Sequence, residues 1–147
     1  MKKKDQLIIA KMLSDDIQHV FMTHFTDVLN EHNLSSKHLT IIEFVRMKAQ
    51  VTMNEVANLL KATPSAASQI ISKLEAQDYL KREVNKANRR ETLVCLGNKG
   101  EELANQIDKK ENELIEKYYL QLPLEDIEAY CDIIKKLHGI VMKGEKA

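Results

Sequence analysis

Apolar positions recur every three or four residues over most of this chain, which is the spacing of amphipathic helices. The pattern is clearest between Thr63 and Leu80, where apolar residues at positions 67, 70, 71 and 74 form one narrow stripe. Thr63 is a good N-cap, and Pro64 suits the first helical position because its missing amide costs little there. The sequence therefore predicts a helix that begins at this point and carries small polar side chains on its outer face.

A shorter helix is predicted just upstream. Thr52 can cap residues 53–61, in which apolar positions 56, 57 and 60 give an inner face. Only Ala62 and Thr63 separate this helix from the next one. Two short helices joined so closely indicate a helix-turn-helix.

Two β-prone segments follow, at residues 79–84 and 91–96, and Val51–Thr52 is a candidate for a short strand beside them. The segment between the two strands reads Asn-Lys-Ala-Asn-Arg-Arg. Because asparagine tolerates the left-handed backbone that a hairpin turn needs, we expect a basic β-wing here. Asp78, just after the predicted helix, can reach the left-handed conformation at some steric cost.

Further amphipathic stretches lie on both sides of these elements. Residues 5–31 and residues 36–47 each predict a helix, and so do residues 98–119. Pro123 interrupts the pattern before a last helix from about Leu124 to Gly144. The first helix and the last two have no sheet to pack on, so we expect their stripes to be buried against each other and against a second copy of the chain.

This order of elements resembles MarR-type winged-helix transcriptional regulators. The resemblance is carried by the helix-turn-helix, the Arg82-Glu83 strand, the Asn88-Arg89-Arg90 wing, the L-x-x-K-G segment that ends at Gly100, and the final L-P-L-E-D-I-E-A-Y stretch. It implies a mainly α fold with a small β-wing. It also implies one MarR-like domain over residues 1–147, with a winged helix-turn-helix module at 36–97 and dimerisation helices at 5–31 and 98–143.

The same resemblance implies a DNA-binding function and the residues that serve it. Short polar side chains on an exposed helix face allow close approach of a partner such as the major groove, although a solvated face is the alternative. In the family the outer positions of this helix face bases, which favours Ser65, Ser68 and Gln69, while Lys73 lies nearer phosphate. The candidate DNA-contacting residues are Thr63, Pro64, Ser65, Ser68, Gln69, Lys73, Arg82, Asn88, Arg89 and Arg90.

The wing departs from the family pattern in one respect. The family usually has aspartate where Asn88 stands, and often another at Asn85, so a salt bridge from aspartate to arginine is not expected here. Asp78 likewise stands where the family usually has glycine. The loss of the two acidic groups leaves the wing more positive. We expect Arg90 to enter the minor groove, where narrow A·T-rich sequence concentrates negative potential.

Charge is unevenly distributed along the chain. The net charge is zero, yet residues 61–90 contain seven Lys or Arg against three Asp or Glu, an excess of 7 − 3 = +4. A basic segment of this kind is what phosphate contacts require. The content of 44% hydrophobic, 30% charged and 5% aromatic residues fits a helix-rich globular protein.

Location and redox state follow from two absences in the sequence. The N-terminal apolar run is too short for a secretory signal, and no run approaches the eighteen residues of a membrane span, so we expect a cytoplasmic protein without membrane contact. Cys95 and Cys131 lack C-x-x-C spacing and are expected to be free, inert thiols rather than oxidant sensors.

Enzyme and metal functions are not supported by the sequence. The first 96 residues contain no glycine, which excludes phosphate-binding glycine loops, and no hydrolase or metalloprotease motif is present. We therefore expect no catalytic residue, no metal and no cofactor. His24 and His38 are candidates for lining a cleft that, in the family, receives small phenolic or lipophilic ligands. The predicted function is a dimeric repressor of a pseudo-palindromic operator that a small ligand releases, and the alternative is a winged-helix adaptor that contacts only proteins.

Overall fold

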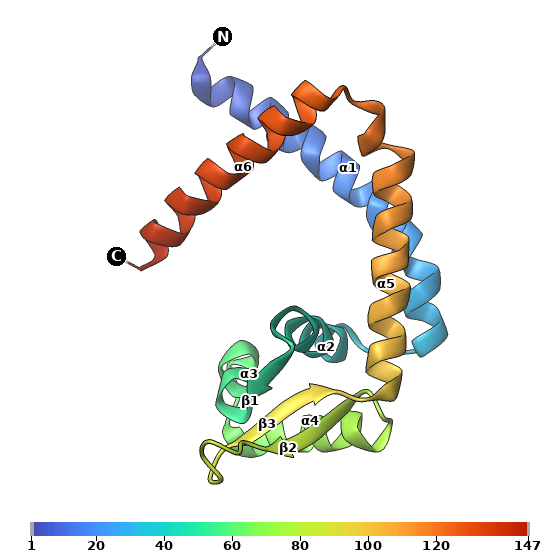
Figure 1. Cartoon of the computed structure of the whole chain (residues 1–147), viewed down its shortest axis with the longest axis vertical. Coiled ribbons are helices and arrows are strands. Elements are labelled where there is room, and N and C mark those ends of the chain that lie inside the picture. Colours follow the sequence, from blue (N-terminus) through green and yellow to red (C-terminus); the bar gives the residue numbers. More distant parts are fainter. Residues whose placement is uncertain (1, 147) are drawn as a thin grey trace. The chain divides into compact units, whose positions relative to one another are not determined.

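The structure is a computed structural model that describes residues 2–146. It has the mainly α architecture with a small β-wing that the sequence predicts (Figure 1). The chain divides into two compact units, one up to Lys109 and one from Lys110 onward. In chain order the elements are α1 (Lys3–His32), α2 (Ser36–Lys48), β1 (Gln50–Thr52), α3 (Met53–Leu60), α4 (Pro64–Ala76), β2 (Leu80–Val84), β3 (Thr92–Leu96), α5 (Asn98–Lys117), a 3-10 turn (Tyr119–Gln121) and α6 (Leu124–Glu145).

The helices of the winged-helix module begin where side chains cap them. The Thr63 hydroxyl accepts a hydrogen bond from the Ala66 amide at 3.1 Å, and Pro64 occupies the first turn of α4, as predicted. Thr52 and Glu55 form a reciprocal capping box at the start of α3. Each such cap stabilises its helix by about 1 kcal/mol, so the capping residues define the short turn between the two helices.

The three strands form an antiparallel sheet in the order β1-β3-β2. Val94 of the central strand pairs with Val51 on one side and with Arg82 on the other. α3 packs on α4, and α4 packs on β2. The helix α4 and the strands of the wing therefore share one core. The largest side chains with almost no exposed surface are Ile41, Ile42, Val45, Val51, Val56, Ile71, Leu74, Leu80, Val94 and Leu103.

The wing turn forms as predicted, but for a different reason. Within residues 2–146 the non-glycine residues with positive φ are Asn33, Ala49, Lys61 and Asp78, and neither wing asparagine is among them. Instead, the Asn85 Oδ1 accepts from the Ala87 amide at 3.0 Å. The Asn88 Oδ1 accepts in the same way from the Arg90 amide at 3.2 Å. The expectation of left-handed asparagines was therefore wrong, because both side chains replace backbone acceptors in Asx turns.

The link between α4 and β2 is held tightly against the start of α5. Asp78 has φ of 66°, the left-handed conformation expected from its position. Its carbonyl accepts from the Lys99 amide at 2.9 Å, and the Tyr79 carbonyl accepts from the Gly97 amide at the same distance. A Cβ on Gly97 would lie 2.5 Å from the Asp78 carbonyl oxygen, and one on Gly100 would collide with that of Tyr79. Glycine at both positions is what allows this close backbone approach.

The first and last helices differ from the module in their exposure. Neither α1 nor α6 contains a buried residue. No helix in the described chain combines the length and the apolar character needed to span a bilayer. The large apolar side chains exposed on these two helices are Leu7, Ile8, Ile9, Met12, Leu13, Ile17, Val20 and Met22 on α1, and Leu124, Tyr130, Ile133, Ile134, Leu137, Ile140, Val141 and Met142 on α6.

Candidate nucleic-acid interface

The outer face of α4 is polar and open. Ser65, Gln69, Ser72 and Lys73 are exposed on it, and Thr63 and Pro64 are exposed at its start. The inner face, with Ala67, Ile71 and Leu74, is fully buried in the core. This division holds the helix in one orientation, so the same polar side chains always face outward.

Ser68 differs from the other polar residues of α4. Its side chain is half-buried on the flank of the helix that faces β2, where its hydroxyl contacts Arg82. Of the three residues expected to read bases, the structure therefore keeps Ser65 and Gln69 on the open face and places Ser68 beside the strand.

Arg82 on β2 is tied to α4 by several hydrogen bonds. Its Nη1 donates to Glu75 Oε1 at 2.7 Å, and its backbone amide donates to the other carboxylate oxygen at 3.1 Å. Its Nη2 donates to the carbonyl oxygen of Ser68 at 3.0 Å and to the hydroxyls of Ser68 and Ser72 at 3.1 and 2.9 Å. The side chain is 26% exposed. Arg82, which the sequence predicts as a DNA contact, thus fastens the strand to the helix in this structure.

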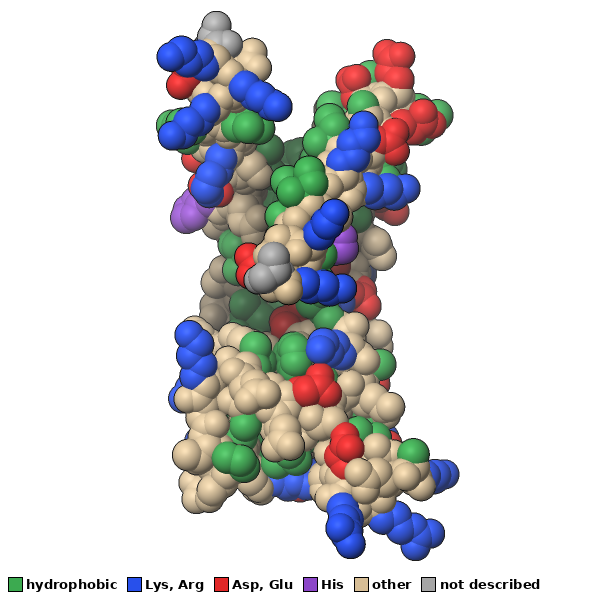
Figure 2. Space-filling view, turned by 90° about the vertical axis from the view of Figure 1, so that its left-hand side faces the viewer, with side chains coloured by type: hydrophobic (Ala, Val, Ile, Leu, Met, Phe, Trp, Pro, Cys, Tyr) green, Lys and Arg blue, Asp and Glu red, His purple; other side chains and the backbone are tan. Residues whose placement is uncertain are grey.

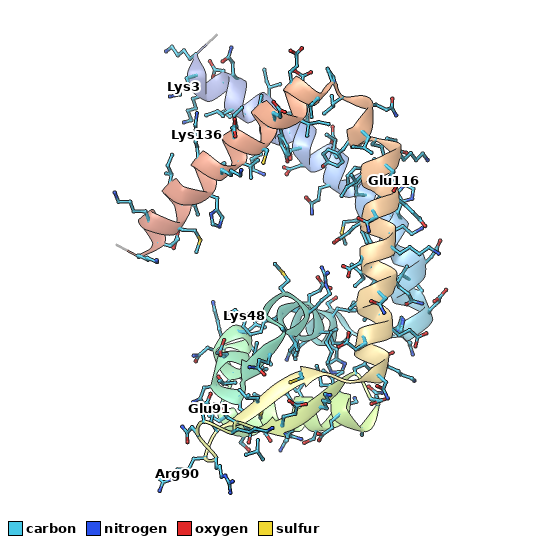
Figure 3. The ribbon with its side chains drawn as sticks, in the orientation of Figure 1. Lys3, Lys48, Arg90, Glu91, Glu116 and Lys136 are labelled. Atoms are coloured by element: carbon cyan, nitrogen blue, oxygen red, sulfur yellow. The ribbon has the colours of Figure 1, made fainter. Side chains whose placement is uncertain are left out.

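The wing carries three exposed basic side chains. Lys86, Arg89 and Arg90 are exposed, and Figure 3 shows Arg90 at the far end of the loop between β2 and β3. Figure 2 shows Lys and Arg side chains gathered at the foot of the view, the end of the molecule that carries the wing. Asn88 is exposed as well, and its side-chain Oδ1 accepts the hydrogen bond from the Arg90 amide that stabilises the turn.

Ion pairing sharpens this distribution of charge. Lys81 pairs with Glu83 at 3.3 Å, and Arg82 pairs with Glu75. Within residues 2–146, no ion pair is formed by Lys61, Lys73, Lys86, Arg89 or Arg90. The unpaired basic side chains of segment 61–90 therefore lie on α4, on the wing and at the end of α3, and a phosphate backbone would neutralise them.

The two histidines expected in a ligand cleft are both half-buried, His24 on α1 and His38 on α2. Partial burial, together with the nearby positive charge of Lys73 and Lys37, lowers the pKa of His38, so it is neutral at physiological pH. The hollows beside the wing and along α6 are lined by other residues, so the structure does not bring His24 and His38 together in them.

A third histidine has the more extensive contacts. His32, at the end of α1, has its Nδ1 2.8 Å from the Tyr79 hydroxyl and its Nε2 2.7 Å from Gln106 Oε1, which accepts. Burial, and then the charge of Glu102, raises the pKa of Tyr79. The three side chains join α1, the α4–β2 link and α5. The sequence places His32 just after the predicted helix at 5–31, which does not predict this junction.

Metal binding and thiol chemistry find little support in the described part of the chain. No group of three or more His, Cys, Asp or Glu side chains there can hold a metal ion. Cys95 and Cys131 are free. The Cys95 thiol donates to Glu83 Oε2 at 3.5 Å, and burial and this carboxylate raise its pKa, so little reactive thiolate forms.

Comparisons with known proteins relate the module to one family. The model of the MarR family matches residues 32–91, which span the helix-turn-helix and the wing up to the end of its turn. Over this segment, which is less than half of the chain, the chain is similar to the MarR family. No curated protein sequence matches the chain. The similarity to solved structures extends over nearly the whole length, and therefore includes the helices outside the matched MarR segment.

Three solved structures illustrate this similarity. FabT of Streptococcus pneumoniae, solved in complex with DNA, is 18% identical with a TM-score of 0.69, over 94% of this chain and 98% of its own. The transcriptional regulator Tm0710 of Thermotoga maritima is 22% identical with a TM-score of 0.67, over 93% and 96%. NadR, solved with 4-hydroxyphenylacetate, is 20% identical with a TM-score of 0.59, over 86% and 89%. At these identities the similarity shows the MarR fold.

Ser72 and Glu75 were not among the candidate site residues, although both lie in the candidate interface through Arg82. Their spacing from Ser68 on α4 is helical, at four and seven residues, which puts the three on one flank. That spacing was visible in the sequence. The missing information was the register of β2, which sets Arg82 opposite that flank.

Proposed function

We propose that this protein is a sequence-specific DNA-binding transcriptional regulator that works as a homodimer. The observation that carries the proposal is the joint geometry of α4 and the wing, with an open polar helix face and unpaired basic side chains in one rigid module. α4 enters the major groove, where Gln69 and Ser65 read base edges and Lys73 contacts phosphate. The family match and the DNA complex of FabT support this assignment.

The wing supplies affinity rather than sequence reading. Arg90 enters the minor groove, and Arg89 and Lys86 lie close enough along the loop to contact the neighbouring phosphates. Because asparagine replaces the family's aspartates while keeping the Asx turns, the loop retains its shape without those two carboxylates beside its arginines. Binding should therefore depend strongly on salt.

The homodimer is proposed from the exposed apolar stripes of the terminal helices. Ile133, Ile140 and Leu124 on α6 are between 60% and 69% exposed, as are Leu7 and Met12 on α1 at 62% and 63%. Contiguous apolar surface of this kind is normally covered by a partner. A second copy of the chain places two α4 helices in successive major grooves, which corresponds to half-sites about one helical turn apart.

The regulatory part of the proposal is that the dimer represses its target genes and that a small lipophilic or phenolic ligand releases it. The support is NadR, a structural neighbour bound to 4-hydroxyphenylacetate, together with the partial burial of His24 on α1 and His38 on α2. In this proposal the protein acts in the cytoplasm and is not an enzyme.

The test begins with selection of preferred duplexes from a random DNA library, followed by fluorescence polarisation over a range of salt concentrations. A DNA-binding dimer should give a selected sequence with inverted half-sites and an affinity that falls steeply as salt rises. The rival function, a winged-helix adaptor for protein contacts, gives neither enrichment nor salt-sensitive binding, and that result would overturn the proposal.

A further inference from the structure

Arg82 donates hydrogen bonds to the hydroxyl oxygens of two serines on α4, Ser68 and Ser72. A serine hydroxyl has one hydrogen to donate and two lone pairs with which to accept. The guanidinium donates to the Ser72 oxygen at 2.9 Å and to the Ser68 oxygen at 3.1 Å. Both serines lie on the flank of α4 that faces Arg82, but Ser72 is exposed to solvent whereas Ser68 is half-buried.

A hydroxyl in this position is biased toward donating. The cation next to its oxygen draws electron density from the O–H group, which strengthens it as a donor. A second donor approaching the same oxygen would bring its partial positive charge beside the guanidinium, which is unfavourable. Within residues 2–146, neither hydroxyl donates to a protein acceptor. The hydrogen of Ser72 is therefore available to a partner outside the chain.

We infer that Arg82 is a positioning residue that makes Ser72 a hydrogen-bond donor, and that Ser72 reads an acceptor on a base edge in the major groove. The inference deepens the proposed DNA-binding function and rests on it. The acceptors at that edge are N7 of a purine, O6 of guanine and O4 of thymine, and the edge of cytosine offers only its amino donor. The base facing Ser72 is therefore guanine, adenine or thymine.

Glu75 completes the arrangement. Its carboxylate accepts hydrogen bonds from the Arg82 side chain and from the Arg82 backbone amide. These two bonds fix the guanidinium against α4. A lysine at position 82 would keep the positive charge but cannot span Glu75, Ser68 and Ser72 at once, because it lacks the fork of donors. Arg82→Lys thus separates charge from positioning.

The experiment uses the full chain and its selected duplex. Each base of one half-site is replaced in turn by an analogue that lacks one group. 7-Deazapurines remove N7, 2-aminopurine removes O6 of guanine and 5-methyl-2-pyrimidinone removes O4 of thymine. Purine in place of adenine and 2-pyrimidinone in place of cytosine remove the amino donors. Affinities are measured for the natural chain, Ser72→Ala, Arg82→Lys and the matched control Ser14→Ala on α1, and thermal unfolding confirms that each variant is folded.

The natural chain should lose about two- to tenfold in affinity at one acceptor-deleted position, the range expected of a single hydrogen bond. Ser72→Ala should abolish the difference at that position only, and Arg82→Lys should reduce it. Ser14→Ala should keep the natural profile.

Retention of every acceptor effect in Ser72→Ala would overturn the inference and leave the DNA-binding function standing. The same holds if Ser72→Ala cancels an effect of deleting an amino donor. Because Ser72→Ala lies on an exposed face, it decides the question even if Arg82→Lys unfolds. If no duplex is selected at all, the proposed function falls, and this inference falls with it.

Discussion

The winged-helix module and the terminal helices use the same kind of sequence pattern to different ends. In the module, the stripe of α4 is covered by the core, with Ala67, Ile71 and Leu74 at 0% exposure and Ile70 partly buried. In α6 the stripe is equally regular, yet Ile134 and Leu137 remain 44% and 53% exposed. Periodicity therefore predicts that a helix has a face to bury, but not whether the same chain covers it. The predictions below probe this difference, from the largest effect to the smallest.

The largest effect is expected where an exposed stripe is covered by a second copy. Ile134→Asp places a charge in the proposed apolar seam and should weaken dimerisation by about 3 kcal/mol or more, with a parallel loss of DNA binding. Sedimentation measures the assembly directly. The control is Lys136→Asp, which also introduces aspartate into α6 but outside its apolar stripe. It should leave the dimer in place. An unchanged dimer in Ile134→Asp would show that α6 does not form the seam.

The next effect tests the tight backbone packing of the module. Gly100→Ala introduces a methyl group against the Tyr79 carbonyl and should lower the free energy of unfolding by about 1–3 kcal/mol. Gly139→Ala on α6 meets no atom within 4 Å and should instead stabilise its helix by up to about 1 kcal/mol. Chemical denaturation measures both variants. Equal effects from the two alanines would contradict the close approach at Gly100.

Within the module, helix and wing should differ in kind. Gln69→Ala removes paired hydrogen bonds to a base and should cost about 1–3 kcal/mol on the selected duplex and little on random DNA. Arg90→Ala should weaken binding to nearly all sequences and reduce the salt slope by about one unit per half-site. Fluorescence polarisation at several salt concentrations separates the two. A salt slope in Arg90→Ala equal to that of the natural chain would show that Arg90 has no electrostatic role in DNA binding.

A smaller effect is expected at the end of α4. Asp78→Gly should raise the free energy of unfolding by about 0.5–1 kcal/mol, because glycine adopts the left-handed conformation without the steric cost borne by aspartate. Gln77→Gly is the control, since Gln77 has φ of −91° and gains nothing from glycine. Thermal unfolding of the two variants should show opposite signs.

No effect is expected from the thiols. Changing Cys95 and Cys131 to Ser should leave operator affinity and its response to peroxide unchanged, because the pKa of Cys95 is raised and its thiolate is scarce at neutral pH. Polarisation assays before and after peroxide treatment measure this. Loss of a peroxide response present in the natural chain would show that one of the cysteines is a sensor.

Much of the fold was predictable because local chemistry determines it. Thr63 and Thr52 cap their helices as expected, and Asp78 adopts the left-handed conformation its position requires. The order of helix, turn, helix and wing follows from these signals. The prediction of a turn in the wing is confirmed, but its asparagines stabilise the turn through their side-chain oxygens rather than through a left-handed backbone.

The candidate site was less predictable where contacts cross between elements. The exposure of Ser65 and Gln69 follows from helical periodicity, since both lie opposite the buried stripe. The partners of Arg82 and His32 depend instead on strand register and on the packing of α1 and α5 beside the module. Residues 7 to 74 positions apart meet there across different elements, and no local pattern encodes such a meeting.

The strand order has a consequence for how the chain folds as it is synthesised. β2 and β3 are joined by a short turn, so the hairpin can form locally. Gln50 of β1, however, pairs with Cys95, and α3, α4 and β2 lie between them in the chain. Closing so long a loop is slow unless the intervening helices have already collapsed. We expect β1 to join the sheet last, so that the recognition helix is in place before the sheet is complete and before α6 leaves the ribosome.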